Sequence, residues 1–559
     1  MPLCSVEGVR ITVDQDLLFN QRQLDVQLIE VNRPKLNLHR ASSGKWNWED
    51  LPLLDQQQGA PPIVKVRDAE VILQWEHEQF ARAVRVQLKA VDADIVPTGM
   101  HRFTFQGTGH EETLGVSQFS GKIDTLHRNW SLAGKLKGLV IDQPFLQAAT
   151  LLSANANRVV SELKNSRMGN SQNLTGYSNA ISGPASEQNS FSLQLTANLE
   201  FEISQQAGAL PEYTLFADLV NGQLMHPGLP IPLDKIQGRI AVDRLGMRLE
   251  QIVLASGKTS AHISGAWGWQ AGDLPRHVTE GFDVVLKDYL VTRETRDYLP
   301  LGSRRVFDDL SPAGILNTSF FIKRGVGRPF DFDLKTAVIS NASMRHRLFS
   351  YPVQQIQGIV RRVDNGLGPE TWSMNFSGVV SGQPATFTGT LIDPGPDYET
   401  EMSVAVNRLP IDKQFYRALR PQDRKILAGL ELQGMTDAQC TIVRKLAVGY
   451  KPIFRIKADV YDASMRVRSF PLAVDQCSGH VEFDENGWLF TRLEGKHGET
   501  QLNGLASVLP QNGDWKLEIT ASAKQARFDQ SLRLACEVAS EEITEAWSSL
   551  QPRGEFDVT

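Results

Sequence analysis

The feature that most constrains the fold is one stretch of sequence that occurs three times. The two clear copies are ASMRHRLFSYPVQQIQG at residues 342–358 and ASMRVRSFPLAVDQCSG at 463–479, and a looser copy is GQLMHPGLPIPLDKIQG at 222–238. Their closing glycines are 120 residues apart (358 − 238) and then 121 apart (479 − 358). Self-similarity at a fixed period predicts an array of like units, each packed against its neighbours.

A second series of glycines has the same period. Gly314, Gly434 and Gly554 are spaced 120 and 120 residues apart (434 − 314 and 554 − 434), and each follows a helix-like stretch. These stretches cover residues 288–310, 410–430 and 530–550. We expect the glycines to leave the helical inserts with a positive φ, a conformation that glycine adopts without steric cost.

Between these inserts the chain is patterned for β-strands. In FSLQLTANLEFEI, residues 191–203, every odd-numbered position is apolar and every even-numbered one is polar. This period-2 alternation predicts a half-buried strand, and it is longer than the usual 5–6 residues. Similar stripes occur near Phe330, Phe454 and Trp515. Residues 142–164 are expected to form an amphipathic helix, followed by a flexible linker rich in Ser, Asn and Gly up to about residue 190.

The composition excludes several classes of protein. The formal net charge of −6 is spread out, and no basic face suggests nucleic-acid binding. The 4 cysteines show no metal-ligand spacing, and the sequence contains no HExxH, GxSxG or Walker motif. The His77 cluster and the Asp331/Asp333 pair are interpreted as solvated. The sequence therefore predicts no enzyme, no catalytic residues, no metal and no cofactor.

Two interpretations account for the apolar stripes. In the first, the stripes pack against a second sheet in a β-sandwich, as in a structural or adhesive repeat protein without lipid. In the second, the sheet stays open and its apolar face shelters acyl chains. An apolar face of this extent must be covered in one of these ways, because monomeric proteins rarely expose more than a few hundred Å² of contiguous apolar surface.

The N-terminal region carries a resemblance to a known family. The segment from Val6 to Leu73, with its Arg33-Pro34 pair and GKWNWEDLP run at residues 44–52, resembles the N-terminal region of the AsmA family. The repeats are similar to the AsmA-like C-terminal region, as in residues 222–242. This resemblance covers most of the chain in patches. It implies a repeating β-groove protein, related to TamB and YhdP, that carries lipid between the two membranes of an envelope.

From the resemblance we expect a mostly β fold: an elongated, curved antiparallel β-sheet groove of ~120-residue repeats, each with one helical insert. The expected location is the periplasm, where the full-length protein is anchored to the inner membrane through an N-terminal helix missing from this chain. The expected partners are phospholipid or another acyl lipid and an outer-membrane or envelope protein. The expected role is lipid transport for outer-membrane biogenesis.

The expected domains and lining residues follow from the repeats. The domains are an AsmA-like N-terminal β region at 1–142, a helix and linker at 143–190, β repeats at 191–310, 311–430 and 431–553, and the truncated start of a further repeat at 554–559. The residues expected to line the lipid groove are Phe191, Leu193, Leu195, Leu199 and Phe201, then Phe330, Phe332 and Leu334, then Phe454, Ile456 and Val460.

Overall fold

The protein is mostly β. A computed structural model describes residues 3–558 except 42–46, 48–59, 76–83, 112–114, 144, 147–191, 210, 227–230, 271, 300, 325–329, 348–349, 364–367, 394–397, 420, 446–451 and 512–513. Of the described residues, 69% are in strands and 11% in helices. The predicted mostly β class with antiparallel strands is thereby confirmed. Most of the predicted 142–164 helix and its linker lie outside the described residues.

The chain forms two compact units, which are considered separately. Unit 1 comprises Met1–Val285 and Phe321–Asp333, and unit 2 comprises Leu286–Phe320 and Leu334–Thr559. Three strands have residues in both units: β15 (Gly281–Val291), β16 (Ala313–Arg324) and β17 (Phe330–Arg345).

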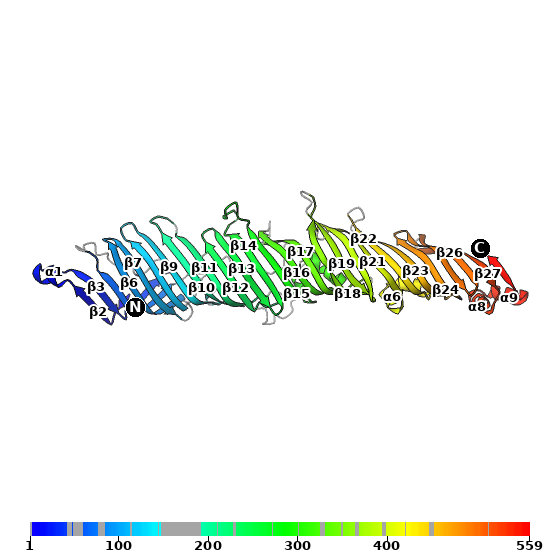
Figure 1. Ribbon diagram of the computed structural model, residues 1–559, viewed down its shortest axis with the longest axis horizontal. Coiled ribbons are helices and arrows are strands. Elements are labelled where there is room, and N and C mark those ends of the chain that lie inside the picture. Colours follow the sequence, from blue (N-terminus) through cyan, green and yellow to red (C-terminus); the bar gives the residue numbers. More distant parts are fainter. Residues whose placement is uncertain are drawn as a thin grey trace. The chain divides into compact units, whose positions relative to one another are not determined.

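Unit 1 is an open sheet whose strands follow one another in chain order from β5 onward (Figure 1). Its pairings are antiparallel, except that β5 runs parallel to β3 and β4. The elements are β1 (Cys4–Ser5), β2 (Gly8–Val13), α1 (Gln15–Asn20), β3 (Val26–Asn32), β4 (Lys35–Arg40), β5 (Ile63–Trp75), β6 (Val84–Gly99), β7 (Arg102–Glu111), β8 (Gly115–Asp124), β9 (Asn129–Ile141), β10 (Ser192–Gln205), β11 (Glu212–Met225), β12 (Lys235–Asp243), β13 (Gly246–Ser256) and β14 (Thr259–Gly268).

Unit 2 repeats this arrangement and adds helices. Its strands from β17 to β28 pair antiparallel with their chain neighbours. The strands are β18 (Pro352–Val363), β19 (Thr371–Val380), β20 (Gln383–Ile392), β21 (Glu399–Ile411), β22 (Gln433–Arg444), β23 (Ile453–Val467), β24 (Phe470–Asp484), β25 (Gly487–His497), β26 (Thr500–Gln511), β27 (Asp514–Arg527) and β28 (Glu555–Val558). The helices are α4 (Thr295–Tyr298), α5 (Leu301–Leu310), α6 (Lys413–Ala418), α7 (Pro421–Ala428), α8 (Gln530–Ala539) and α9 (Glu541–Leu550).

Many of the long strands carry a β-bulge, which bends them. At these bulges the register shifts, and a residue other than glycine often has a positive φ, as at Asp68, Gln251, Gln355 and Gln476. A bulge adds a residue to one strand of a pair and bends that strand. An L-residue with positive φ costs roughly 1–2 kcal/mol, so the surrounding packing must stabilise each bend.

At most of the bulges within the strands the residue that follows the positive φ is buried, and these buried residues form what we call the crease. In unit 1 the crease comprises Ala69, Val91, Leu139 and Ile252, together with Ala197 at the bulge of β10. In unit 2 it comprises Tyr289, Ala342, Ile356, Leu409, Ala463, Cys477 and Ala526.

The crease residues are buried although the strands in the described part of each unit form one sheet, with no second sheet packed on it. Their burial therefore comes from lateral packing between neighbouring strands that close around the bend. Ala197, for example, packs in a cluster with Leu219, Ile236 and Ile252 from β11, β12 and β13. The predicted open sheet is observed in each unit, and the sandwich interpretation lacks its facing layer among the described residues.

The two repeated sequence features meet at the crease. Gly314 and Gly434 have φ values of +152° and +154°, so the predicted positive φ is observed. A Cβ atom added at Gly314 would lie 2.4 Å from Cβ of Ala342, and one added at Gly434 would lie 2.5 Å from Cβ of Ala463. The repeated glycine is thus required by close approach as well as by its φ, because the crease alanine of the adjacent strand occupies the space.

We expect Gly434→Ala to destabilise unit 2 by about 2–4 kcal/mol, because both the backbone conformation and the contact with Ala463 are unfavourable. Gly382→Ala is the matched control: Gly382 also has a positive φ, but an added Cβ has no neighbour within 4 Å, so its expected cost is about 1 kcal/mol. Urea unfolding followed by circular dichroism compares the two variants. Equal shifts of the unfolding midpoint would contradict the close-approach explanation.

Candidate functional site: an apolar track on each sheet

One face of unit 1 carries an unbroken row of apolar residues that runs across the strands. Each member lies directly opposite the next in the strand register, and alternation along each strand places them all on the same face. The row, which we call track 1, comprises Val9, Val31, Val66, Ala93, Gly107, Phe119, Gly134, Phe201, Leu215, Val242, Met247 and Trp267. At about 4.8 Å between strands, it extends roughly 50 Å along the sheet.

The glycines of track 1 are covered by aromatic rings, so they do not interrupt it. A Cβ atom added at Gly107 would lie 2.5 Å from Cζ of Phe119, and one added at Gly134 would lie 2.5 Å from Cζ of Phe201. Each phenylalanine therefore lies flat over the glycine of the adjacent strand. This arrangement keeps the surface apolar where the glycines lack side chains, and it explains why these strands tolerate glycine.

The opposite face at the same depth is polar. One residue further along the strands β2, β3, β5 and β6, the register aligns Arg10, Glu30, Lys65 and Asp94, whose charges alternate in sign. Opposite charges directly across a strand pair stabilise the pairing by roughly 0.2–1 kcal/mol. The two faces of unit 1 therefore differ sharply in character, as the period-2 sequence pattern predicted.

Unit 2 carries a second row of the same kind, track 2. Its members are Ile339, Gly358, Phe376, Phe387, Val404, Cys440, Ile456, Phe483, Trp488 and Val508, on the strands from β17 to β26. By the same strand spacing it extends roughly 40 Å along the sheet. Phe483, Trp488 and Phe490 form an aromatic group in this part of unit 2, with ring centroids 4.5 Å and 6.2 Å apart in successive pairs.

Most track residues are half-buried, whereas the crease residues are buried. A bent single sheet produces this difference in burial. The parts of the strands on either side of the bend enclose the crease, and those parts themselves remain accessible to solvent. The face has the shape and chemistry to hold an extended apolar molecule, since its lining is carbon and sulfur on neighbouring strands.

Most of the predicted lining residues that the structure describes share a face with the track residue of their strand by alternation, but Leu334 does not: it lies five residues from Ile339 with no bulge between them, and so on the opposite face of β17. Phe201 and Ile456 are members of the tracks. Leu193, Leu195 and Leu199 of β10, Leu334 of β17, and Phe454 and Val460 of β23 are half-buried strand residues. Phe191 lies outside the described residues, and for Phe330 and Phe332 the structure describes the backbone but not the side chains.

Sequence reasoning missed the crease. Alanines such as Ala197 and Ala463 carry too weak a hydrophobic signal to be singled out, and no alternation marks a bulge. A signal was nevertheless present: Ala342 and Ala463 open the two clear copies of the repeated stretch. Identical alanines at the same place in a repeat indicate close packing, which the structure shows to be with Gly314 and Gly434.

A depression of about 830 Å³ lies on unit 1, and its lining includes five consecutive members of track 1: Ala93, Gly107, Phe119, Gly134 and Phe201. The other lining residues are mostly polar and include two ion pairs, Lys135–Glu200 at 2.9 Å and Arg67–Asp94 at 2.7 Å. These pairs are about one-third exposed or more and contribute little to stability. The middle of track 1 therefore borders a hollow whose lining combines apolar and charged residues.

Among the residues that the structure describes, no group of three or more His, Cys, Asp or Glu side chains is placed to hold a metal ion. None of the helices described is long and apolar enough to cross a membrane.

The thiol of Cys440 reports on the environment of track 2. Burial raises the pKa of the Cys440 thiol to about 11, because desolvation disfavours the thiolate. Its strand neighbours on the track are Val404 and Ile456. The desolvation at Cys440 therefore comes from its neighbours within the sheet, since no second sheet faces it in the described residues.

Comparisons with known proteins identify no relative. No protein-family model, no curated protein and no solved structure matches the chain.

We expect Cys440 to react slowly with iodoacetamide, with a rate that keeps rising up to about pH 11, because only about one thiol in a thousand is ionised at pH 8 when the pKa is about 11. The exposed Cys4 in the same chain is the internal control. Peptide mass mapping after timed alkylation measures both rates. Alkylation of Cys440 as fast as that of Cys4 at pH 8 would show that the track is open to water at this point.

Proposed function

We propose that this chain holds the acyl chains of phospholipid or another acyl lipid along its apolar tracks and works as a bridge-like lipid carrier of the AsmA-like type. The observation that carries the proposal is the presence, in each unit, of an unbroken apolar row across many strands that no second sheet covers in the described residues. No catalytic step is required for such a role, so the proposed function is non-enzymatic.

The energetics favour an acyl chain as the cover. Burying a methylene group is worth about 0.8 kcal/mol, so a sixteen-carbon chain costs on the order of 12 kcal/mol to expose to water. A track of adjoining apolar residues lets such a chain move from one strand to the next without full exposure. The track gains as well, because its half-buried residues lose their remaining contact with water.

The repeat interpretation is part of this proposal and has support within unit 2. Positive φ values recur at Asp288 and Arg408, 120 residues apart (408 − 288), and at Gln355 and Gln476, 121 apart (476 − 355). In this interpretation the chain is a series of like segments, and each added segment extends a track by adding strands. A track built this way has no fixed length.

The helices of unit 2 support the same interpretation. The backbone N–H of Arg347 donates to the carbonyl of Asp309, just before the end of α5, and the N–H of Arg468 donates to the carbonyl of Gly429, just after α7. These contacts are related by 121 residues on the donor side (468 − 347) and 120 on the acceptor side (429 − 309). In the proposed repeat, each helical insert is thus fixed to the hairpin that follows it.

The location and the partners in the proposal come from the sequence resemblance. An AsmA-like carrier would work in the periplasm, anchored to the inner membrane through an N-terminal segment, and would deliver lipid toward the outer membrane with an envelope protein as its partner. The apolar tracks are the feature of this chain that such a role uses.

The direct test is lipid extraction and mass spectrometry of the purified chain. We expect co-purified phospholipid or another diacyl lipid. A fluorescent fatty acid should bind, and its binding should slow the alkylation of Cys440. Purified protein that carries no lipid and binds no acyl probe would refute the proposal.

We expect the double variant Leu195→Asp/Leu199→Asp to lose at least tenfold of its lipid loading, because two carboxylates on the apolar face must be desolvated when an acyl chain binds. The matched control is Gln194→Asp/Asn198→Asp on the same strand, whose side chains are exposed on the other face. Circular dichroism checks the fold of both variants.

Each remaining outcome of this comparison is informative. Unfolding of the Leu195→Asp/Leu199→Asp variant, with the control intact, would show that these leucines form a core and not a binding face. Equal lipid loading in the two variants would show that β10 does not contact the lipid.

A further inference from the structure

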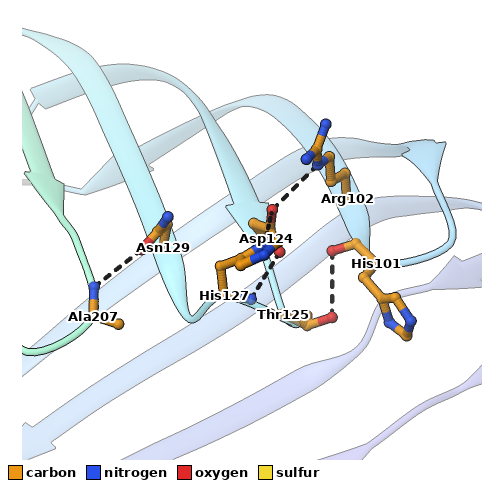
Figure 2. A network of polar contacts seen from close by, with 7 residues as sticks. All are labelled: His101, Arg102, Asp124, Thr125, His127, Asn129 and Ala207. Atoms are coloured by element: carbon orange, nitrogen blue, oxygen red, sulfur yellow. Dashed lines mark hydrogen bonds and ion pairs between the residues drawn. The ribbon is translucent and has the colours of Figure 1, made fainter.

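Three successive turns at one end of the strands of unit 1 are fixed to one another, and we call them the rim. They join β6 to β7, β8 to β9, and β10 to β11. The N–H of Thr125 in the second turn donates to the carbonyl of His101 in the first at 2.9 Å. The N–H of Ala207 in the third donates to Oδ1 of Asn129 at 3.0 Å. Figure 2 shows the Asn129–Ala207 contact and a second hydrogen bond of the Thr125–His101 pair, from the Thr125 hydroxyl to the same carbonyl at 3.3 Å.

Asp124 reinforces the first two turns. Its carboxylate accepts hydrogen bonds from the N–H of His127 at 3.0 Å and from Nε of Arg102 at 3.2 Å (Figure 2). The hydrogen bond from the His127 backbone, with those from the His127 and Arg102 side chains, lowers the pKa of Asp124 to about 2. The network therefore persists at any physiological pH and gives the rim a defined shape.

This fixed rim presents large apolar side chains to water. Met100 in the first turn and Leu126 in the second are each 63% exposed, and Trp130, which follows the second turn, is 36% exposed. Nε1 of Trp130 donates to Oε1 of Gln205 at 3.2 Å, which ties its polar end to the strand beside it. Rigid turns that hold apolar side chains outward, with an indole at their base, are typical of a surface that enters the interface of a membrane.

The apolar rim continues toward α1. The parallel strands β3 and β5 begin at the same end of the sheet where β6 ends, since Leu28 pairs with Ile63 and Val64 pairs with Ile95. The segment that leads into β3 contains Phe19, 77% exposed, and Leu24, 70% exposed.

The first two turns of the rim carry a net positive charge. Lys122, Arg102 and Arg128 are exposed cations in or beside the first two turns, and the carboxylate among them is Asp124, which is 18% exposed and already bonded to Arg102 and His127. Basic side chains around exposed apolar residues complement the phosphate groups of anionic lipids.

We propose that the rim of unit 1 docks onto the surface of a membrane that contains anionic phospholipid. Met100 and Leu126 enter the headgroup region, Trp130 lies at the interface, and Lys122, Arg102 and Arg128 contact lipid phosphates. Because the rim lies at the ends of the strands that carry track 1, such docking places that edge of the apolar face next to the bilayer. The inference does not depend on the track itself being occupied.

The test is flotation of the purified chain with vesicles of phosphatidylcholine alone and of phosphatidylcholine mixed with phosphatidylglycerol. We expect the chain to float with the anionic vesicles and much less with the neutral ones. Met100→Asp/Leu126→Asp should weaken flotation at least tenfold. Lys122→Gln/Arg128→Gln should weaken binding to the anionic vesicles by about fivefold for each cation removed.

The matched control is Val116→Asp/Met225→Asp, which changes two residues that are 51% and 50% exposed at the other end of strands in the same sheet. It should float like the unchanged chain. Failure of the unchanged chain to float with anionic vesicles, or equal flotation of the Met100→Asp/Leu126→Asp variant, would overturn the proposal. A third outcome would also overturn it: the unchanged chain self-associates in light scattering, the Met100→Asp/Leu126→Asp variant does not, and neither binds vesicles. That result would assign the rim to protein contacts.

The outcome is separable from that of the proposed lipid-holding function. The Leu195→Asp/Leu199→Asp variant, altered on the track, should still float with anionic vesicles. If that variant loses flotation while the rim variant keeps it, the track and not the rim contacts the membrane.

Discussion

The structure depends on the segregation of side chains onto two faces of a single sheet. In most β proteins an apolar face is buried by a second layer, but in the described part of each unit such a layer is missing and neighbouring strands supply the burial instead. Lateral packing alone buries little on a flat sheet. The bulges solve this problem by bending the strands, so that residues such as Ala197 and Ala463 reach 0% and 3% exposure within one layer.

This solution stores strain in the backbone. Asp68, Gln251, Gln355 and Gln476 adopt a positive φ without being glycine, and each is followed by a buried residue. Strained residues persist only where their surroundings over-determine them. Here the surroundings are the crease itself, because the residue after the bend packs against its counterparts on the adjacent strands. The bulges are therefore part of the architecture, and replacing them would flatten the sheet and expose the crease.

The same constraint leaves the apolar residues outside the crease incompletely buried. Track residues away from the crease keep contact with water, and only an external apolar molecule can remove that contact. The glycines under Phe119 and Phe201 show that the surface is maintained even where a side chain is missing. A continuous surface of this kind, with an apolar and basic rim at one end of its strands, links two proposals that concern different parts of unit 1: the track for the acyl chain and the rim for the bilayer.

The sequence by itself determined the period of the repeated stretch, the strand class and the face on which the apolar residues lie. Alternation in residues 191–203 was sufficient for this, because the side-chain period of a strand is fixed at two. The 120-residue spacing also singled out Gly314 and Gly434 as positions of positive φ, but it did not reveal their contacts with Ala342 and Ala463. Only the tertiary structure decided whether the apolar face meets a second sheet, where the strands bend and which residues of different strands align into a track. Those properties depend on register and bulges, which are set by contacts between strands distant in sequence, and no local pattern encodes them.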